Sequence, residues 1–271
     1  MNNFSKRIIS GLVYVAVFLS AILFSKDTYV LLMLFFASVC LWEFSNIIKT
    51  KSIVSYAMLA FLGAAVFLDK LEYLHQNNLI KILLVYTLAS LCLLLLGLFN
   101  DKFFQRKDRF SQQLLPVKYV VLPFFFLMLL PFVKSIYTPS LIIATIVIIW
   151  TNDSFAYLVG KNFGKHKLFE KVSPKKTIEG FIGGLFFAVL VGVGIGYYSG
   201  NFPLIHWAII AILISVFGTL GDLVESKFKR KAGVKDSGTI MPGHGGLLDR
   251  LDSLFFLAPF LYLYIHFFVV V

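Results

Sequence analysis

The sequence predicts an all-α, polytopic integral membrane protein with about nine transmembrane helices, and three observations support this prediction. Hydrophobic residues make up 59% of the 271 residues, and the mean hydropathy is +0.85, far above that of a soluble domain. Apolar runs long enough to cross a membrane recur along the whole chain. Lysine and arginine gather in alternate connections between these runs. Because each span needs about 20 residues, residues 1–271 are expected to form a single membrane domain.

Nine apolar runs define the expected helices in order. The first follows Lys6 and Arg7 but lacks a cleavage site of small residues, so it is expected to be a transmembrane helix and not a signal peptide. The third and fifth runs have only 16 residues each, which is short for a full span. The runs are Ile8–Phe24, Thr28–Ile48, Ile53–Leu68, Leu79–Phe99, Val117–Phe132, Ser140–Gly160, Ile178–Tyr198, Pro203–Asp222 and Leu247–Val271.

The positions of the basic residues predict the orientation of the chain. If the N-terminus is cytoplasmic, 21 of the 25 lysines and arginines lie on the cytoplasmic side, and the four outside are Lys26, Lys70, Lys81 and Lys134. Such an imbalance is typical of membrane proteins with positively charged cytoplasmic loops. The N-terminus is therefore expected in the cytoplasm and the C-terminus outside. The net charge of +11 lies in short loops beside the spans, which favours anionic lipid over nucleic acid as the partner.

The stretch Gly221–Asp252 is the most polar part of the chain, with five acidic and six basic residues between two apolar runs. Hydrocarbon does not accept such a density of charge, so this stretch is expected in water or in a protected polar cavity. The aspartates Asp222, Asp249 and Asp252 reach the same membrane face under the predicted orientation. Carboxylates held close together need a cation among them, and hard oxygen ligands favour Mg²⁺. The alternative for Asp249 is a salt bridge to Arg250 or Lys235.

Two stretches upstream carry further polar residues on the cytoplasmic side. Residues Ser173–Gly180 are expected to open a helix, with Lys175 and Lys176 facing a phosphate; the alternative is an ordinary basic loop with a helix cap. Asn152 and Asp153 interrupt a very apolar run. They either bind a base, a ribose or a metal, or serve as polar packing between helices.

Two further polar residues have more than one possible role. His244 lies in a glycine-rich turn whose backbone N–H groups are suited to phosphate, or it is simply exposed. Glu43 is an acid within the second run, without an evident partner in the sequence. Its role stays open.

Together these motifs resemble one known family. Residues Ser226–Arg230, Lys235–Gly238 and Pro242–Asp252 resemble the signature of the phosphatidate cytidylyltransferases, also called CDP-diacylglycerol synthases. The stretches Asn152–Tyr157 and Ser173–Gly180 agree with that family, whereas the first ~140 residues match it only as a series of spans. The resemblance implies a Mg²⁺-dependent enzyme that makes CDP-diacylglycerol and pyrophosphate from CTP and phosphatidic acid. It also implies a nine-helix homodimer, in the inner membrane of a bacterium, with the active site facing the cytoplasm.

The roles that follow from this resemblance are expectations about named residues. Asp222, Asp249 and Asp252 would hold Mg²⁺, with a second cation left open. The catalytic residues are expected to be these three aspartates with Lys229, Arg230 and Arg250. The substrate-binding residues are expected to be Asn152, Asp153, Ser173, Lys175, Lys176, Lys235, Asp236, His244, Gly245 and Gly246.

Two other functions compete with nucleotidyl transfer. A CTP-dependent polyprenol or phytol kinase belongs to a distantly similar family and would release CDP. An ion or phosphate transporter would place polar groups at the middle of the membrane in broken helices, whereas the charges here crowd one face. The catalytic helices and loops are expected within residues 140–271, and residues 1–135 are expected to supply helices for dimer or lipid contacts.

Overall fold

The computed structural model describes residues 3–68, 78–100, 109–133, 136–241, 243 and 245–269. His244 of the predicted site lies outside the described residues, as do five residues of the charge count, Lys70, Lys102, Arg106, Lys107 and Lys134. Most of the described chain is helical. The helices are α1 (Asn3–Phe24), α2 (Lys26–Ile47), α3 (Ile53–Phe67), α5 (Leu79–Phe99), α6 (Arg109–Pro116), α7 (Leu122–Leu129), α8 (Pro139–Phe163), α9 (Ile178–Ser199), α10 (Leu204–Lys231) and α11 (Leu248–Tyr264), with π-helical turns η2 (Val117–Val121) and η3 (Ile265–Val269).

Two small antiparallel hairpins accompany the helices. One pairs β1 (Phe132–Val133) with β2 (Ile136–Tyr137). The other pairs β3 (Lys167–Phe169) with β4 (Ser173–Thr177). The prediction of an all-α chain therefore holds for the apolar helices, but two of the connections between them are β-hairpins that it did not include.

Each predicted apolar run corresponds to a helical segment in the described residues. Seven of these helices are long and apolar enough to cross a membrane, and Ile9–Phe24 and Ile53–Phe67 are shorter. The fifth run was expected to be short, but its apolar helical segment extends over 20 residues, Phe110–Leu129. It is longer because the helix starts in polar residues ahead of Val117, where hydropathy alone gives no signal. The total of nine spans and their orientation stay predictions.

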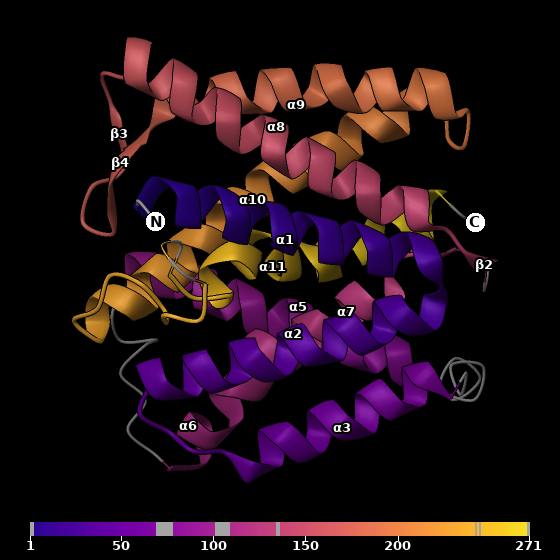
Figure 1. The fold of residues 1–271 in the computed structure, drawn as a ribbon, viewed down its shortest axis with the longest axis vertical. Coiled ribbons are helices and arrows are strands. Elements are labelled where there is room, and N and C mark those ends of the chain that lie inside the picture. The colour runs from indigo at the N-terminus through magenta and orange to yellow at the C-terminus, as the bar shows by residue number, and fades with distance from the viewer. Residues whose placement is uncertain are drawn as a thin grey trace.

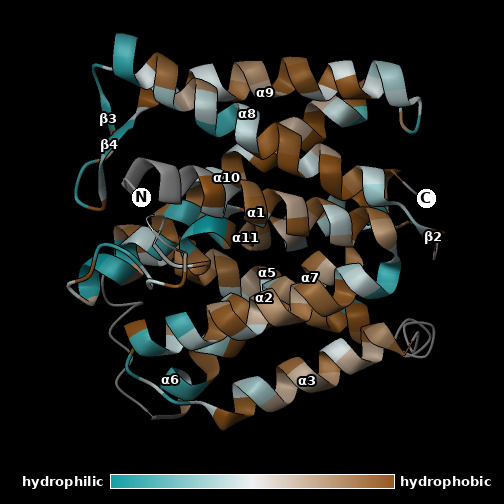
Figure 2. Ribbon diagram, viewed as in Figure 1, coloured by the Kyte–Doolittle hydropathy of each residue, from teal (hydrophilic) through white to brown (hydrophobic). Residues whose placement is uncertain are grey.

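The helices lie side by side in layers (Figure 1). Helices α8 and α9 lie along one edge, α1, α10 and α11 in the middle, α2, α5 and α7 next, and α3 at the opposite edge. The β3–β4 hairpin and the N-terminus lie at one end of the helices, and β2 and the C-terminus at the other. Hydrophilic residues gather at the β3–β4 end, whereas the helices are mostly hydrophobic (Figure 2).

Helix α9 packs closely on its neighbours through small residues. Gly180, Gly184, Gly192 and Gly196 are all buried on it at multiples of four residues, so they share one face. A Cβ atom at Gly184 would lie 2.6 Å from the backbone oxygen of Asn152 on α8, so only glycine permits this approach. Small residues at such intervals are typical of helix contacts in membranes. The contact fixes the stretch of α8 that carries the predicted polar residues.

The segment η2–α7 packs against α11 through aromatic side chains. Pro123 lacks the N–H that a continuous α-helix would use, and the π-helical turn η2 precedes it. The ring of Phe255 on α11 lies 5.1 Å from the ring of Phe124 and 5.4 Å from that of Tyr119, centroid to centroid. All three side chains are fully buried. This aromatic packing holds the middle of α11 in place.

Candidate active site

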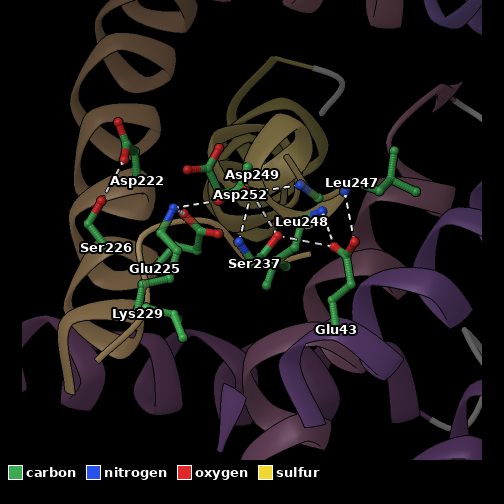
Figure 3. A network of polar contacts seen from close by, with 12 residues as sticks. Glu43, Asp222, Glu225, Ser226, Lys229, Ser237, Leu247, Leu248, Asp249 and Asp252 are labelled. Atoms are coloured by element: carbon green, nitrogen blue, oxygen red, sulfur yellow. Dashed lines mark hydrogen bonds and ion pairs between the residues drawn. The ribbon is translucent and has the colours of Figure 1, made fainter. Parts of the chain in front are cut away.

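The site forms where the end of α10 meets the beginning of α11 (Figure 3). The eighth apolar run was expected to end at Asp222, but helix α10 continues to Lys231. Two features explain the extension. Glu225 and Lys229 form a pair four residues apart, and three basic residues lie in the last turn, where they interact favourably with the negative end of the helix.

Three carboxylates converge in this site. Asp222 and Glu225, three residues apart on α10, and Asp252 on α11 each place an oxygen within 4.8 Å of the other two. Glu225 is only 1% exposed and Asp252 only 7% exposed, whereas Asp222 is half-buried. Three acids this close repel one another unless a cation joins them. Their oxygen atoms are the donors that a hard divalent cation prefers.

Asp249 lies beside this cluster but is engaged differently. Its Oδ1 accepts a hydrogen bond from Lys229 Nζ at 2.6 Å. Its Oδ2 accepts three hydrogen bonds of 2.9 Å each, from the backbone N–H and the hydroxyl of Ser237 and from the N–H of Gly246. The structure thus brings together Asp222 and Asp252 of the predicted metal set, with Glu225 as their third neighbour. The metal role of Asp249 stays a prediction. Asp249 does form a salt bridge, but with Lys229, whereas the alternative named Arg250 or Lys235 as the partner.

Positive side chains offset the acids from two directions. Lys229, only 8% exposed, lies between Glu225 Oε2 at 2.5 Å and Asp249 Oδ1 at 2.6 Å. Lys176 reaches across from the β3–β4 hairpin and forms an ion pair with Asp222. The hairpin and α10 therefore meet at the acid cluster.

The β3–β4 hairpin differs from the prediction for Ser173–Gly180. Ser173 opens strand β4 and pairs with Phe169, so the expected helix entry at Ser173 is wrong. The helix α9 begins at Ile178, and Thr177 caps it by accepting a hydrogen bond of 3.1 Å from the N–H of Gly180. Lys175 and Lys176 consequently lie on a strand that is turned toward the acid cluster.

Glu179 fastens this hairpin to the first turn of α9. Its carboxylate accepts hydrogen bonds from the backbone N–H groups of Lys165 at 3.0 Å and His166 at 3.2 Å. It also lies 2.6 Å from Nδ1 of His166. Glu179 therefore joins the chain before β3 to the helix after β4, and this contact fixes the base of the hairpin that carries Lys176.

Three neighbouring cavities, which share lining residues, lie at this site. The first, of about 340 Å³, has a charged side of Asp153, Asp222, Glu225, Lys229, Asp249, Arg250 and Asp252 and an apolar side of Tyr14, Phe18, Ile146, Ile149 and Trp150. The second, of about 290 Å³, shares Asp153 and Asp222 with it and adds Asn152, Lys161, Lys175 and Lys176. The third, of about 540 Å³, shares Arg250 and adds Lys235, Asp236 and Gly245. The acid cluster thus lies next to both a basic cavity and an apolar wall.

Comparison with known proteins gives the family. The model of the cytidylyltransferase family matches residues 5–268, nearly the whole chain. The chain belongs to the cytidylyltransferase family. It is 34% identical over 265 residues to the phosphatidate cytidylyltransferase of Bacillus subtilis (strain 168), covering 97% of each chain. It is 52% identical over 122 residues to the phosphatidate cytidylyltransferase of Staphylococcus aureus (strain COL), covering 44% of this chain and 46% of that protein.

The remaining predicted residues of this cytidylyltransferase take varied positions. Asn152 is buried and donates a hydrogen bond of 3.3 Å to Asp153, while its own Oδ1 has no hydrogen-bond partner among the described residues. Arg230 is exposed and donates to the backbone oxygen of Val234 at 3.2 Å, past the end of α10. Gly245 has a φ of +91°, which favours glycine, and its backbone oxygen bonds to the N–H of Met241.

Two residues join the site beyond the sequence prediction. Glu225 was not among the expected metal ligands; its position three residues after Asp222, which places both side chains on one face of a helix, was the available signal. Glu43 on α2 accepts hydrogen bonds from the N–H groups of Leu247 at 3.1 Å and Leu248 at 2.7 Å. Its presence within a membrane helix was a signal of importance, but its partners lie about 200 residues further along the chain.

Proposed function

We propose that this cytidylyltransferase transfers the cytidylyl group of CTP to phosphatidic acid, giving CDP-diacylglycerol and pyrophosphate for phospholipid biosynthesis. The family match and the names of the relatives support this reaction. The observation that carries the proposal is the cluster of Asp222, Glu225 and Asp252, the last two of them buried, beside a cavity with one charged and one apolar side. A site that joins a nucleotide to a lipid needs a charged side for the phosphates and an apolar side for the acyl chains.

Mg²⁺ is the cofactor that fits this cluster. Three carboxylates meet within 4.8 Å, and Oε1 of the buried Glu225 has no hydrogen-bond partner among the described residues. Asp222, Glu225 and Asp252 would hold the ion, with Asp249 as the predicted further ligand. When bound, the ion would neutralise negative charge on the acids and on the transferring phosphate.

The basic residues would hold the phosphates. Lys175 and Lys176 line the second cavity together with Asn152, which places charge and an amide next to one another for a nucleotide. Arg250 lines the first and third cavities and would bind the phosphate nearest the acids. These groups would align the substrates and offset their mutual repulsion, which is the main obstacle to phosphoryl-group chemistry.

The lipid phosphate is the nucleophile in this proposal. One of its oxygens would form a bond to the α-phosphorus of CTP, and the bond from that phosphorus to the pyrophosphate oxygen would break. A phosphate monoester loses its second proton near pH ~6, so it is already largely dianionic at neutral pH. No residue is therefore assigned as a general base. The apolar wall formed by Tyr14, Phe18 and Trp150 would face the acyl chains.

The location and the assembly are also parts of the proposal. We infer a bacterial inner-membrane protein with a cytoplasmic active site, because the hydrophilic end in Figure 2 carries the β3–β4 hairpin and its lysines. We also propose the homodimer that the family resemblance implies. Native mass spectrometry of the protein in detergent tests this assembly. A mass of one chain would contradict the dimer.

The reaction is tested with purified protein in lipid nanodiscs. CTP labelled at the α-phosphorus is supplied with phosphatidic acid and Mg²⁺. We expect the label in the lipid and one pyrophosphate released per lipid formed. A lipid kinase would instead leave the label in CDP. Asp252→Asn serves as the control for a reaction at this site and is expected to lower the rate by about 100-fold or more.

A further inference from the structure

Glu43 occupies an unusual position for an acid on a membrane helix. It lies near the end of α2, is fully buried, and faces residues about 200 positions away in the sequence. Its carboxylate accepts hydrogen bonds from the N–H groups of Leu247 and Leu248 and lies 3.2 Å from the hydroxyl of Ser237, whose single proton it shares with Asp249 (Figure 3). It does not belong to the acid cluster around Asp252.

The contact supplies a cap that α11 lacks. The first N–H groups of a helix have no partners within the helix, and the N-terminus carries partial positive charge. Residue Leu247 occupies the cap position of α11 and has no side-chain oxygen to offer. The carboxylate of Glu43, reaching from α2, satisfies two of these N–H groups. A negative charge at this end also matches the helix dipole.

The loop before α11 is shaped around this carboxylate. A Cβ atom at Gly246 would overlap the hydroxyl of Ser237 and lie 2.7 Å from both oxygens of Glu43, and one at Gly238 would overlap the same carboxylate. Only residues without side chains permit the loop to pass this close. Glu43 therefore accounts for the glycine at 238, and Glu43 together with Ser237 accounts for the glycine at 246.

A continuous set of contacts joins Glu43 to the acids. The hydroxyl of Ser237 contacts both Glu43 and Asp249, and Asp249 in turn binds Lys229, which reaches Glu225. Asp252 lies one turn further along α11 from the capped end. The axial position of α11 thus determines how Asp249 and Asp252 face α10.

We propose that Glu43 is a positioning residue for the cytidylyl transfer, which fixes the first turn of α11 and the preceding loop so that Asp252 faces Asp222 and Glu225. This inference rests on the proposed function. It assigns Glu43 no contact with substrate or metal. Because a displacement of about 1 Å at a reacting group can lower a rate by about 100-fold, the contact matters beyond its contribution to stability.

Glu43→Gln tests the proposal with little change in shape. The amide turns one accepting oxygen into a donor that faces an N–H donor, so α11 loses part of its cap. We expect kcat to fall by about tenfold or more, KM for CTP and for phosphatidic acid to change by less than about threefold, and the affinity for Mn²⁺, followed by electron paramagnetic resonance, to fall by about tenfold. A purely structural role would lower the amount of folded protein and leave these constants unchanged.

The matched control is Ser45→Ala on the same helix. Ser45 is buried, and its hydroxyl has no hydrogen-bond partner among the described residues. The kcat and the Mn²⁺ affinity of the Ser45→Ala variant are expected to equal those of the unmodified protein. If Glu43→Gln does not fold, Ser237→Ala replaces it, since this change removes only the hydroxyl that links Glu43 to Asp249. It is expected to lower kcat severalfold.

The outcomes separate this proposal from the reaction itself. If folded Glu43→Gln keeps kcat within about threefold of the unmodified protein and binds Mn²⁺ equally well, Glu43 has no positioning role. In the same way, an unchanged kcat and Mn²⁺ affinity in Ser237→Ala would overturn the inference. If the unmodified protein fails to convert phosphatidic acid, the proposed function fails. The Mn²⁺ affinities of the variants still decide whether Glu43 positions the acids.

Discussion

At the residue scale, Glu225 combines two roles that are usually separate. It belongs to the acid cluster with Asp222 and Asp252, and it forms an ion pair with Lys229. Lys229 is shared with Asp249 in turn. A single lysine therefore offsets the buried Glu225 and the partly buried Asp249. The remaining negative charge lines the cavity, where a divalent cation would neutralise it.

Replacement of Glu225 by glutamine is expected to weaken metal binding. The amide keeps the size of the side chain but removes a negative charge from the cluster. We expect the Mg²⁺ concentration for half-maximal rate to rise by about tenfold or more, as measured by pyrophosphate release over a Mg²⁺ titration. Glu170→Gln, the same change at an exposed position of the hairpin loop, is the control. An unchanged Mg²⁺ requirement in Glu225→Gln would exclude Glu225 as a ligand.

Removal of the lysine is expected to affect stability. Lys229→Met leaves Glu225 and Asp249 without their shared cation, and loss of one partner of a buried ion pair costs about 3–5 kcal/mol. We expect a lower temperature of thermal unfolding, measured with a thiol-reactive or intrinsic fluorescence probe. The double variant Lys229→Met/Glu225→Gln should recover part of the loss, because one unpaired acid is gone. If Lys229→Met and the unmodified protein unfold at the same temperature, this account is contradicted. Lys231→Met, at an exposed position on the same helix, is the control.

The chemical types of the site residues were predictable, but their partners were not. A helical interval relates Asp222 to Glu225, and an acid in an apolar run marks Glu43 as a residue of interest. The contact from Glu43 to Leu248 depends on how α2 packs against α11, which no local pattern encodes. The same holds for Asp249, whose two oxygens bind Lys229 and the loop.

At the element scale, the close contact of α8 with α9 sets the geometry of the second cavity. Gly184 faces the backbone of Asn152, so the two helices touch without intervening side chains. Asn152 and Asp153 are directed by that contact toward the cavity that they share with Lys176. The small residues of α9 thus act on the site without lining its acid cluster.

Gly184→Ala tests this arrangement. Its methyl group would lie 2.6 Å from the backbone oxygen of Asn152, so α8 and α9 must move apart. We expect a loss of about 1–3 kcal/mol of stability, as for an overpacked core, and a rise in KM for CTP in a steady-state assay. Gly194→Ala on the same helix meets no atom within 4 Å and should behave like the unmodified protein. Identical behaviour of the two variants would refute the role of close packing.

The positions of the elements were largely predictable and their ends were not. Hydropathy located every apolar helical segment, because lipid requires apolar residues over the length of a span. The hairpin of β3 and β4 was missed since a Ser-Pro pair is equally typical of a helix entry. The end of α10 was placed early because its last turns are charged, and hydropathy does not distinguish a polar helix from a loop.

At the scale of the whole molecule, polar contacts join the two predicted parts of the chain. Lys227 on α10 donates hydrogen bonds to the backbone oxygens of Gly97 and Leu98 at the end of α5, at 2.7 and 2.9 Å. Such contacts satisfy carbonyl groups at a helix end. Glu43 forms a second link between the parts. We therefore expect residues 140–271 to depend on residues 1–135 for their geometry.

The orientation of the whole molecule is tested by labelling single cysteines. In a variant with Cys40 and Cys92 replaced by alanine, Lys171→Cys and Asn201→Cys place exposed thiols at the hairpin and after α9. Since 21 of 25 basic residues favour the cytoplasm on the hairpin side, an impermeant maleimide should label Asn201→Cys in whole cells and Lys171→Cys only after lysis. The reverse pattern would place the site outside the cytoplasm.

The bond between α2 and α11 has a consequence for biosynthesis. Ribosomes make α2 early, so Glu43 enters the bilayer long before Leu247 and Leu248 exist to receive it. An ionised side chain in that setting carries a cost on the order of a few kcal/mol until its partners arrive. Insertion of the final helix therefore removes this cost, and a chain that ends before Leu247 lacks both N–H partners of Glu43.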